Sequence, residues 1–176
     1  MLSETDLKQI IFYPLSAKID SGSFDCGDKD LNGFLRDDAL GYQQDHLAFT
    51  TCLFHGDQFL AYYSVMADSL SLSTGEKRLF RENKHLREYP ALKIARLACQ
   101  KSLKNNRLGS LITKVVKGFA VTLNDQGIAI RFITVDAYPE AIGFYEKCGF
   151  TINRSETEKK TLPHSISMRF DLYAPV

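Results

Sequence analysis

The chain has 176 residues, of which 44% are hydrophobic and 24% are charged, and its formal net charge at pH 7 is +1. This length predicts one domain over residues 1–176, and this composition excludes both a disordered polyelectrolyte and a membrane protein. No apolar run approaches the roughly 20 residues that span a bilayer, and the start of the chain lacks the features of a secretory signal. We therefore expect a cytoplasmic protein.

The first half of the chain predicts a strand, a helix and a pair of strands. An apolar run at 10–15 is typical of a strand, and a turn rich in Ser, Gly and Asp follows at 20–27. Asp28 can cap a helix whose apolar residues recur at helical spacing up to Tyr42. Two runs of β-forming residues follow, at 46–54 and at 58–65 with a continuation to about residue 72. The Gly-Asp turn between them predicts an antiparallel pair.

The second half alternates strands and helices. A charged stretch at 73–90 is expected to be partly helical, and Pro90 marks the entry of a strand at 91–99. The strongest helical pattern is the apolar series from Leu108 to Leu123, which is stopped by the residues at 124–127. A strand at 131–135 follows, then a short helix that begins at Pro139 and ends at Gly149.

The chain ends with two more expected strands, one starting at Phe150 and one at 165–172. Within the short helix before them, the residues expected to face inward are Ala141, Ile142, Phe144 and Tyr145. This order of elements predicts an α/β (α+β) fold, in which helices flank a mixed, mostly antiparallel central sheet. It does not predict a doubly wound nucleotide-binding fold.

Positive charge is concentrated in the middle of the chain. Residues 1–75 carry 4 basic and 11 acidic side chains, residues 76–117 carry 12 and 3, and residues 118–176 carry 6 and 7. The central group includes Lys77, Arg78, Arg81, Lys84, Arg87, Lys93, Arg96, Lys101, Lys104 and Arg107. Such a segment can attract a polyphosphate or an RNA backbone, and it is equally typical of a solvated loop face.

The cysteines and histidines do not predict a metal site. The cysteines, Cys26, Cys52, Cys99 and Cys148, are far apart, with no CxxC pair and no histidine at metal-finger spacing. Each lies beside apolar residues, which favours a reduced core residue over a redox or nucleophilic role. The 4 histidines are scattered and are expected to be surface or structural residues.

The segment that opens the long helix is the first candidate site. It consists of Lys104, Asn105, Asn106, Arg107, Leu108, Gly109 and Ser110. The first turn of a helix leaves backbone N–H groups unpaired and carries the positive end of the helix dipole, so it can bind a pyrophosphate. Lys104 and Arg107 add positive charge there. The alternative is an ordinary polar turn between a strand and a helix.

The second candidate is Tyr145, in the segment 144–150. Read as structure alone, Phe144 and Tyr145 are core aromatics of a short helix. Read as function, a tyrosine, whose ordinary pKa is about 10, can give a proton to a departing thiolate and stay un-ionised beforehand.

Taken together, in this order and at this separation, the two segments resemble the GNAT superfamily of N-acetyltransferases. In that family a loop with the pattern Q/R-x-x-G-x-G/A binds the pyrophosphate of acetyl-CoA. Gly109 matches its last position, Lys104 is a basic substitute at its first, and Arg107 stands in place of the central glycine. The segment 141–150 is similar to the family's late helix, A-x-x-F-Y-x-x-x-G-F.

The resemblance implies a single GNAT-like domain and a role for each matching segment. It implies that Tyr145 is the general acid toward the CoA sulfur, and that the strand with Leu97, Ala98 and Cys99 holds the pantetheine arm and the thioester carbonyl through its main chain. Acetyl-CoA is the implied co-substrate. The implied cofactor-binding residues are Leu97, Ala98, Cys99, Lys104, Asn105, Asn106, Arg107, Leu108, Gly109 and Ser110, with no metal.

A narrower resemblance covers most of residues 20–152. The segments that carry it are Phe24-Asp25-Cys26-Gly27, Leu31-Asn32, Phe34-Leu35, Tyr62-Tyr63-Ser64 and Arg96-Leu97-Ala98. They are similar to the toxin-type branch of the superfamily, whose members acetylate the free α-amino group of aminoacyl-tRNA and pair with a small antitoxin. The implied acceptor is thus a primary amine, such as that of aminoacyl-tRNA. The oligomeric state, monomer or homodimer, is left open.

The expected reaction is direct transfer of the acetyl group, with main-chain N–H groups near 97–99 polarising the thioester carbonyl. Water, or an amine that is partly neutral at pH 7, suffices as the base. A covalent route through Cys99 is disfavoured because no histidine is placed by the sequence to activate it. Two alternatives remain open, a catalytically degenerate GNAT fold that binds CoA or a partner, and a non-catalytic RNA-binding protein.

Overall fold

The described strands form one seven-stranded sheet, mixed and mostly antiparallel, in the order β1-β2-β3-β4-β5-β7-β6. The computed structural model describes residues 4–78, 80, 86–103, 107–153 and 165–174. The strands are β1 (Ile11–Pro14), β2 (Phe49–His55), β3 (Gln58–Leu70), β4 (Tyr89–Cys99), β5 (Phe132–Ala137), β6 (Thr151–Ile152) and β7 (Ile166–Asp171). The α+β fold class expected from the sequence is confirmed.

The α-helices are α1 (Glu4–Lys8), α2 (Lys29–Gly33), α3 (Ala39–Gln44), α4 (Thr74–Lys77), α5 (Leu108–Asp125) and α6 (Ile142–Lys147). Shorter helical turns are Ser21–Ser23, Phe34–Asp38, Lys101–Leu103 and Pro139–Ala141. Among the described residues, no helix has both the length and the apolar character that crossing a membrane requires.

Contacts group the residues into two compact units. Unit 1 comprises Met1–Met66 and Ile94–Lys114, and unit 2 comprises Ala67–Lys93 and Val115–Val176. Along the chain, β3, β4 and α5 each begin in one unit and end in the other. Each unit contains a hydrophobic cluster of its own.

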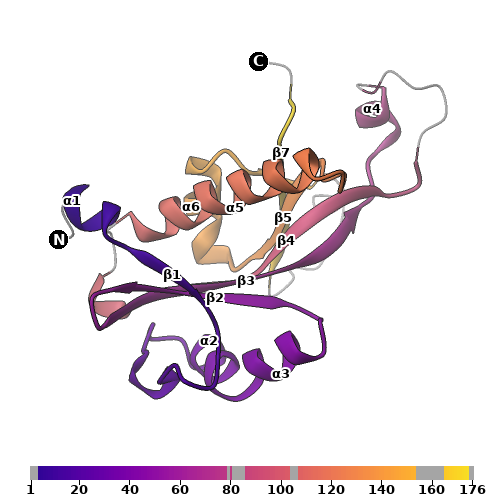
Figure 1. Cartoon of the computed structure of the whole chain (residues 1–176). Coiled ribbons are helices and arrows are strands. Elements are labelled where there is room, and N and C mark those ends of the chain that lie inside the picture. Colours follow the sequence, from indigo (N-terminus) through magenta and orange to yellow (C-terminus); the bar gives the residue numbers. More distant parts are fainter. Residues whose placement is uncertain (1–3, 79, 81–85, 104–106, 154–164, 175–176) are drawn as a thin grey trace. The chain divides into compact units, whose positions relative to one another are not determined.

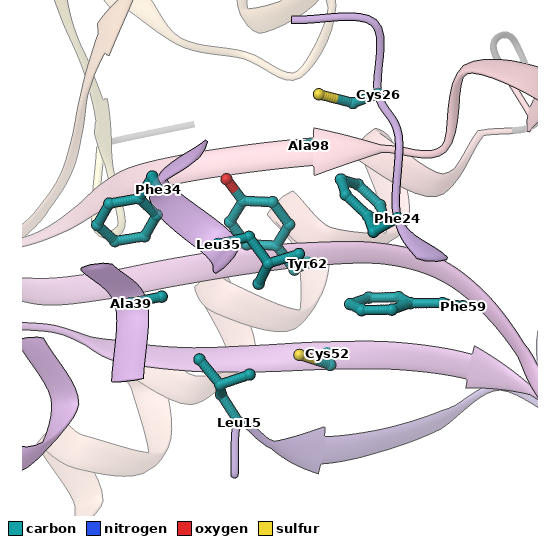
Figure 2. Close-up of a cluster of buried hydrophobic side chains, with 10 residues drawn as sticks. All are labelled: Leu15, Phe24, Cys26, Phe34, Leu35, Ala39, Cys52, Phe59, Tyr62 and Ala98. Atoms are coloured by element: carbon teal, nitrogen blue, oxygen red, sulfur yellow. The ribbon is translucent and has the colours of Figure 1, made fainter. Parts of the chain in front are cut away.

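The core of unit 1 is built around Tyr62 of β3. Figure 2 shows its ring between Phe24 and Phe34, and the ring centroids lie 5.4 and 6.5 Å from those two neighbours. The side chain is fully buried, and its hydroxyl donates a hydrogen bond of 2.7 Å to the carbonyl of Leu31. A buried hydroxyl without a partner is costly, so this bond favours the position of α2 that places the Leu31 carbonyl beside Tyr62.

The helical segment after Asp28 begins and ends for local reasons. As predicted, the Asp28 side chain caps α2, accepting from the Leu31 N–H at 3.0 Å. A π-helical turn at 34–38 then joins α2 to α3, and both helices lie beside the strands of this unit (Figure 1). His46 ends α3 in the left-handed region, at φ +58°, and the Leu47 N–H donates to the Tyr42 carbonyl.

This helix end corrects the predicted start of β2. The strand begins at Phe49 rather than at residue 46, because His46 and the two residues after it close the helix. The hairpin itself is confirmed: β2 pairs antiparallel with β3, and Gly56 takes φ +56° in the turn between them.

β4 and β6 also start differently from expectation. β4 begins at Tyr89, so Pro90 lies inside the strand instead of marking its entry. The missing N–H of Pro90 is tolerated at the second residue of the strand, and its carbonyl accepts from the Arg131 N–H at 3.0 Å. β6 starts at Thr151, because the Phe150 N–H still closes the preceding helix by donating to the Tyr145 carbonyl.

The rest of unit 2 is held by an ion pair and by antiparallel pairing. β7 pairs with β5 along its whole length and with both residues of β6. Ser73 and Glu76 form a capping box at α4, and the Glu76 carboxylate also pairs with Arg169 of β7. This pair ties the charged stretch before β4, predicted only as partly helical, to the sheet.

The predicted ends of the two later helices are confirmed. α5 stops where the sequence indicated, with Gly127 at φ +90°, and Pro139 opens a helical turn that leads into α6. Gly149, at φ +85°, follows the end of α6. A methyl group added at Gly149 would meet the ring of Phe170 at 3.2 Å, so the turn is also closely packed.

Candidate functional site

The end of β4 carries three of the predicted cofactor-binding residues, Leu97, Ala98 and Cys99. Ala98 is buried in the core of unit 1, while Leu97 and Cys99 are half-buried. The backbone beyond Cys99 is held in place, because the Gln100 N–H donates to the Leu60 carbonyl at 2.8 Å. The main chain that would face a thioester is therefore part of a fixed strand end.

The Phe24–Gly27 segment fastens this strand end. The Asp25 N–H donates to the side-chain oxygen of Gln100 at 2.7 Å, and the Asp25 carbonyl accepts from the Lys101 N–H at 2.9 Å. The Asp25 carboxylate accepts from the Gly27 N–H at 2.8 Å, from the Asn32 amide at 2.9 Å and from the Lys101 ammonium. The segment that carried the narrower resemblance thus acts locally as a clip on the end of β4.

The clip also changes the acidity of Asp25. The hydrogen bonds from Lys101, and then those from Asn32 and Gly27, lower the pKa of Asp25 from 3.8 to about 2. The carboxylate therefore remains charged throughout the physiological range. In the sequence, Phe24–Gly27 stood out only through its resemblance to the toxin-type branch. Nothing in the sequence indicates that Asp25 and Lys101 form a pair.

Cys99 does not have the environment of a nucleophile. Burial raises the pKa of the Cys99 thiol from 9.0 to about 12 and also raises that of nearby Cys26. Since the thiolate is the reactive form of cysteine, this argues against a covalent route through Cys99.

The segment at the head of α5 is described from Arg107 onward. The predicted residues Lys104, Asn105 and Asn106 lie outside the described residues. Arg107 is exposed and takes φ +59°, in the left-handed region that glycine adopts most readily. This backbone conformation explains why the family pattern has glycine here, and it shows that the arginine adopts the conformation all the same.

The first turn of α5 contains three of the residues predicted to bind the cofactor. The Arg107 carbonyl accepts the first helical hydrogen bond, from the Leu111 N–H at 2.9 Å. The N–H groups of Leu108, Gly109 and Ser110 lie in this turn, at the positive end of the helix dipole. Leu108 is only 1% exposed and anchors the turn in unit 1, so these amides have fixed positions.

Tyr145 lies on α6 in unit 2 and is 6% exposed. Its ring packs edge-on against Phe144, with centroids 4.9 Å apart, and against Phe150 at 5.4 Å. Of the four residues expected to face inward, only Tyr145 is buried, and Ala141, Ile142 and Phe144 are half-buried. The predicted inward face is thus fully buried only at Tyr145.

The basic segment is partly used inside the fold. Lys93 pairs with Asp136 at 2.6 Å, and Lys101 pairs with Asp25 of the clip. The Arg96 guanidinium lies 4.9 Å from the ring centroid of Phe34. Arg81, Lys84 and Lys104 lie outside the described residues. The charge count alone therefore overstates the positive charge offered to an RNA backbone.

Each unit contains a cavity lined by described residues. The cavity in unit 2 has a volume of about 480 Å³ and is lined in part by Glu76, Phe132 and Arg169. The cavity in unit 1 has a volume of about 440 Å³ and is lined in part by Tyr13 and Phe54. Neither is lined by any residue that the sequence predicted for the site.

The family of the chain follows from comparison with known protein families. The family model described as an acetyltransferase (GNAT) domain matches residues 66–172. The chain belongs to the GNAT acetyltransferase family. This GNAT domain is thus an acyl-CoA-dependent N-acetyltransferase, with acetyl-CoA as its co-substrate. No curated protein matches the chain.

Solved structures share the GNAT fold over almost the whole chain. AtaT complexed with acetyl-methionyl-tRNAfMet is 20% identical, with a TM-score of 0.74 over 92% of this chain and 94% of that one. An AtaT mutant toxin bound to acetyl-CoA and the C-terminus of the antitoxin AtaR is 19% identical, with a TM-score of 0.70 over 93% and 94%. A mutant of KacT is 20% identical, with a TM-score of 0.71 over 93% and 95%.

Proposed function

We propose that this GNAT domain transfers the acetyl group of acetyl-CoA to the free α-amino group of aminoacyl-tRNA. The observation that carries the proposal is the shared fold with AtaT complexed with acetyl-methionyl-tRNAfMet, which extends over 92% of this chain and so includes the part that precedes residue 66. That part contains the Phe24–Gly27 clip, which is fastened to the end of β4 by Asp25.

The donor is held by main-chain groups of unit 1. The amides of Leu108, Gly109 and Ser110 bind the diphosphate, because they lie in the first turn of α5, at the positive end of its dipole. The exposed Arg107 side chain adds a charge-assisted contact. N–H groups at 97–99 polarise the thioester carbonyl, and the clip keeps that backbone fixed.

The transfer is direct. The amine nitrogen forms a bond to the acetyl carbonyl carbon, the carbon–sulfur bond breaks, and the sulfur leaves as a thiolate. Tyr145 donates its phenolic proton to that thiolate, and the resulting phenolate regains a proton from water. The proton lost by the amine passes to water, and an α-amino group is partly neutral at pH 7, so no strong base is required.

A small antitoxin is the proposed partner, by analogy with the AtaT mutant bound to the C-terminus of AtaR. We also place the reaction in the cytoplasm. The cysteines, Cys26, Cys52, Cys99 and Cys148, are all free thiols, as a reducing compartment maintains.

The test is release of free thiol from acetyl-CoA in the presence of charged tRNA, uncharged tRNA, peptides and polyamines in separate reactions. We expect release with charged tRNA and none with uncharged tRNA. Tyr145→Phe is expected to slow the release while leaving acetyl-CoA binding unchanged, and Tyr13→Phe, at an exposed tyrosine of β1, is the matched control. Acetyl-CoA binding without thiol release for any acceptor would support the degenerate binding module, whereas RNA binding that ignores acetyl-CoA would support the non-catalytic alternative.

A further inference from the structure

Lys117 of α5 reaches the end of the helix that carries Tyr145. Its ammonium donates a hydrogen bond of 2.7 Å to the Cys148 carbonyl, immediately after α6. A carbonyl at the end of a helix has no partner within the helix and carries the negative end of its dipole, so a cation is favoured there. Lys117 is therefore a side-chain cap supplied by a different helix of unit 2.

The same ammonium is enclosed by aromatic rings. It lies 3.4 Å from the ring centroid of Phe170 on β7 and 5.4 Å from that of Phe150. Both distances fall within the range in which a cation is attracted to the face of a ring. The lysine is half-buried, so the contact is partly shielded from water.

A continuous series of contacts leads from Lys117 to Tyr145. Phe170 packs on Phe150 with centroids 5.7 Å apart, and Phe150 packs edge-on against Tyr145 at 5.4 Å. The Phe150 N–H also donates to the Tyr145 carbonyl at 3.0 Å. Backbone and side chain of Tyr145 are thus both fixed by the turn that Lys117 caps.

We propose that Lys117 is a positioning residue for the reaction: it holds the turn at 148–150 and thereby sets the orientation of the Tyr145 phenol. The proposal rests on the function proposed above, in which Tyr145 protonates the leaving thiolate. Lys117 itself takes no part in proton transfer.

The first test measures the turn without any substrate. Lys117→Met keeps an apolar stem but removes the donor and the charge, Lys117→Arg keeps both, and Lys114→Met removes an exposed charge one turn earlier on α5. Amide hydrogen exchange over 142–153 is expected to rise about tenfold or more in Lys117→Met, and to stay near wild type in Lys117→Arg and Lys114→Met. Unchanged exchange in Lys117→Met, with melting temperatures confirming that all variants fold, would overturn the proposal.

The second test asks whether Lys117 acts through Tyr145. Small displacements of a catalytic group cost up to about 100-fold in rate, so we expect Lys117→Met to lower kcat by about 10- to 100-fold with acetyl-CoA affinity unchanged. In a Tyr145→Phe background, Lys117→Met is expected to have no further effect on kcat. An equal loss in both backgrounds would contradict a positioning role. If Tyr145→Phe alone keeps the full kcat, then Tyr145 is not the general acid and the proposed function loses that step. The hydrogen-exchange result would still decide whether Lys117 holds the turn.

Discussion

Arg107→Gly is expected to change stability and acetyl-CoA affinity in opposite directions. The left-handed conformation costs an L-residue about 1–2 kcal/mol, and glycine avoids this cost. Glycine also has more conformational freedom in the unfolded chain, which offsets about 0.5–1 kcal/mol of that gain. Because Arg107 takes φ +59°, the substitution is expected to stabilise the unliganded chain by up to about 1 kcal/mol. For a chain of this size, that corresponds to a rise of roughly 2–4 °C in Tm.

Affinity is expected to fall because the exposed guanidinium is lost from the diphosphate. A charge-assisted hydrogen bond contributes about 1.5–3 kcal/mol, so acetyl-CoA should bind about tenfold or more weakly, as measured by calorimetry. Arg107→Asn serves as a control, since asparagine tolerates left-handed angles and also removes the charge. Tighter binding in Arg107→Gly would refute the reasoning, because it would mean that the arginine obstructs the phosphate site.

Further substitutions test the structural parts of the account. Asp25→Asn removes the carboxylate that Lys101 pairs with. The pKa of Asp25 is lowered from 3.8 to about 2, so the stability that this carboxylate contributes is complete above pH 3.8 and is lost as the pH falls toward 2. In an acid titration of unfolding, the wild type should show this loss and the variant should not. Gly149→Ala should lower unfolding stability by about 1–3 kcal/mol in denaturant titrations, from its left-handed backbone and the close ring of Phe170. Tyr62→Phe should cost about 0.5–1.5 kcal/mol, because the hydrogen bond from the Tyr62 hydroxyl to the Leu31 carbonyl is lost. Stabilities equal to wild type would contradict each.

Elements whose signals are local could be predicted from the sequence. The apolar period of α5, the glycine turn at Gly56, and the start and stop of the α6 region at Pro139 and Gly149 all depend on residues close in the chain. The start of β2 could not be predicted, because the β-prone run at 46–54 begins with residues that end α3. Among them, His46 takes the left-handed conformation. Histidine adopts that conformation more often than most residues, but too rarely for the residue type to predict it.

The site could be predicted only as separate segments of the sequence, without the contacts between them. Tyr145 and the first turn of α5 were recognisable by their patterns, whereas the clip between Asp25 and Lys101 joins residues 76 positions apart. The role of Lys117 is equally hidden, since a lysine on an amphipathic helix ordinarily predicts a solvated face. Contacts of this kind depend on how distant elements pack, which a single sequence does not state.

The central claim is the identity of the acceptor, and the product tests it most directly. Charged tRNA incubated with the protein and acetyl-CoA is digested with nuclease, and the aminoacyl-adenosine fragment is weighed by mass spectrometry. The account predicts one acetyl group on the α-amino nitrogen, at a markedly reduced yield with Tyr145→Phe. An unmodified aminoacyl-adenosine, formed while another amine in the same mixture becomes acetylated, would contradict it.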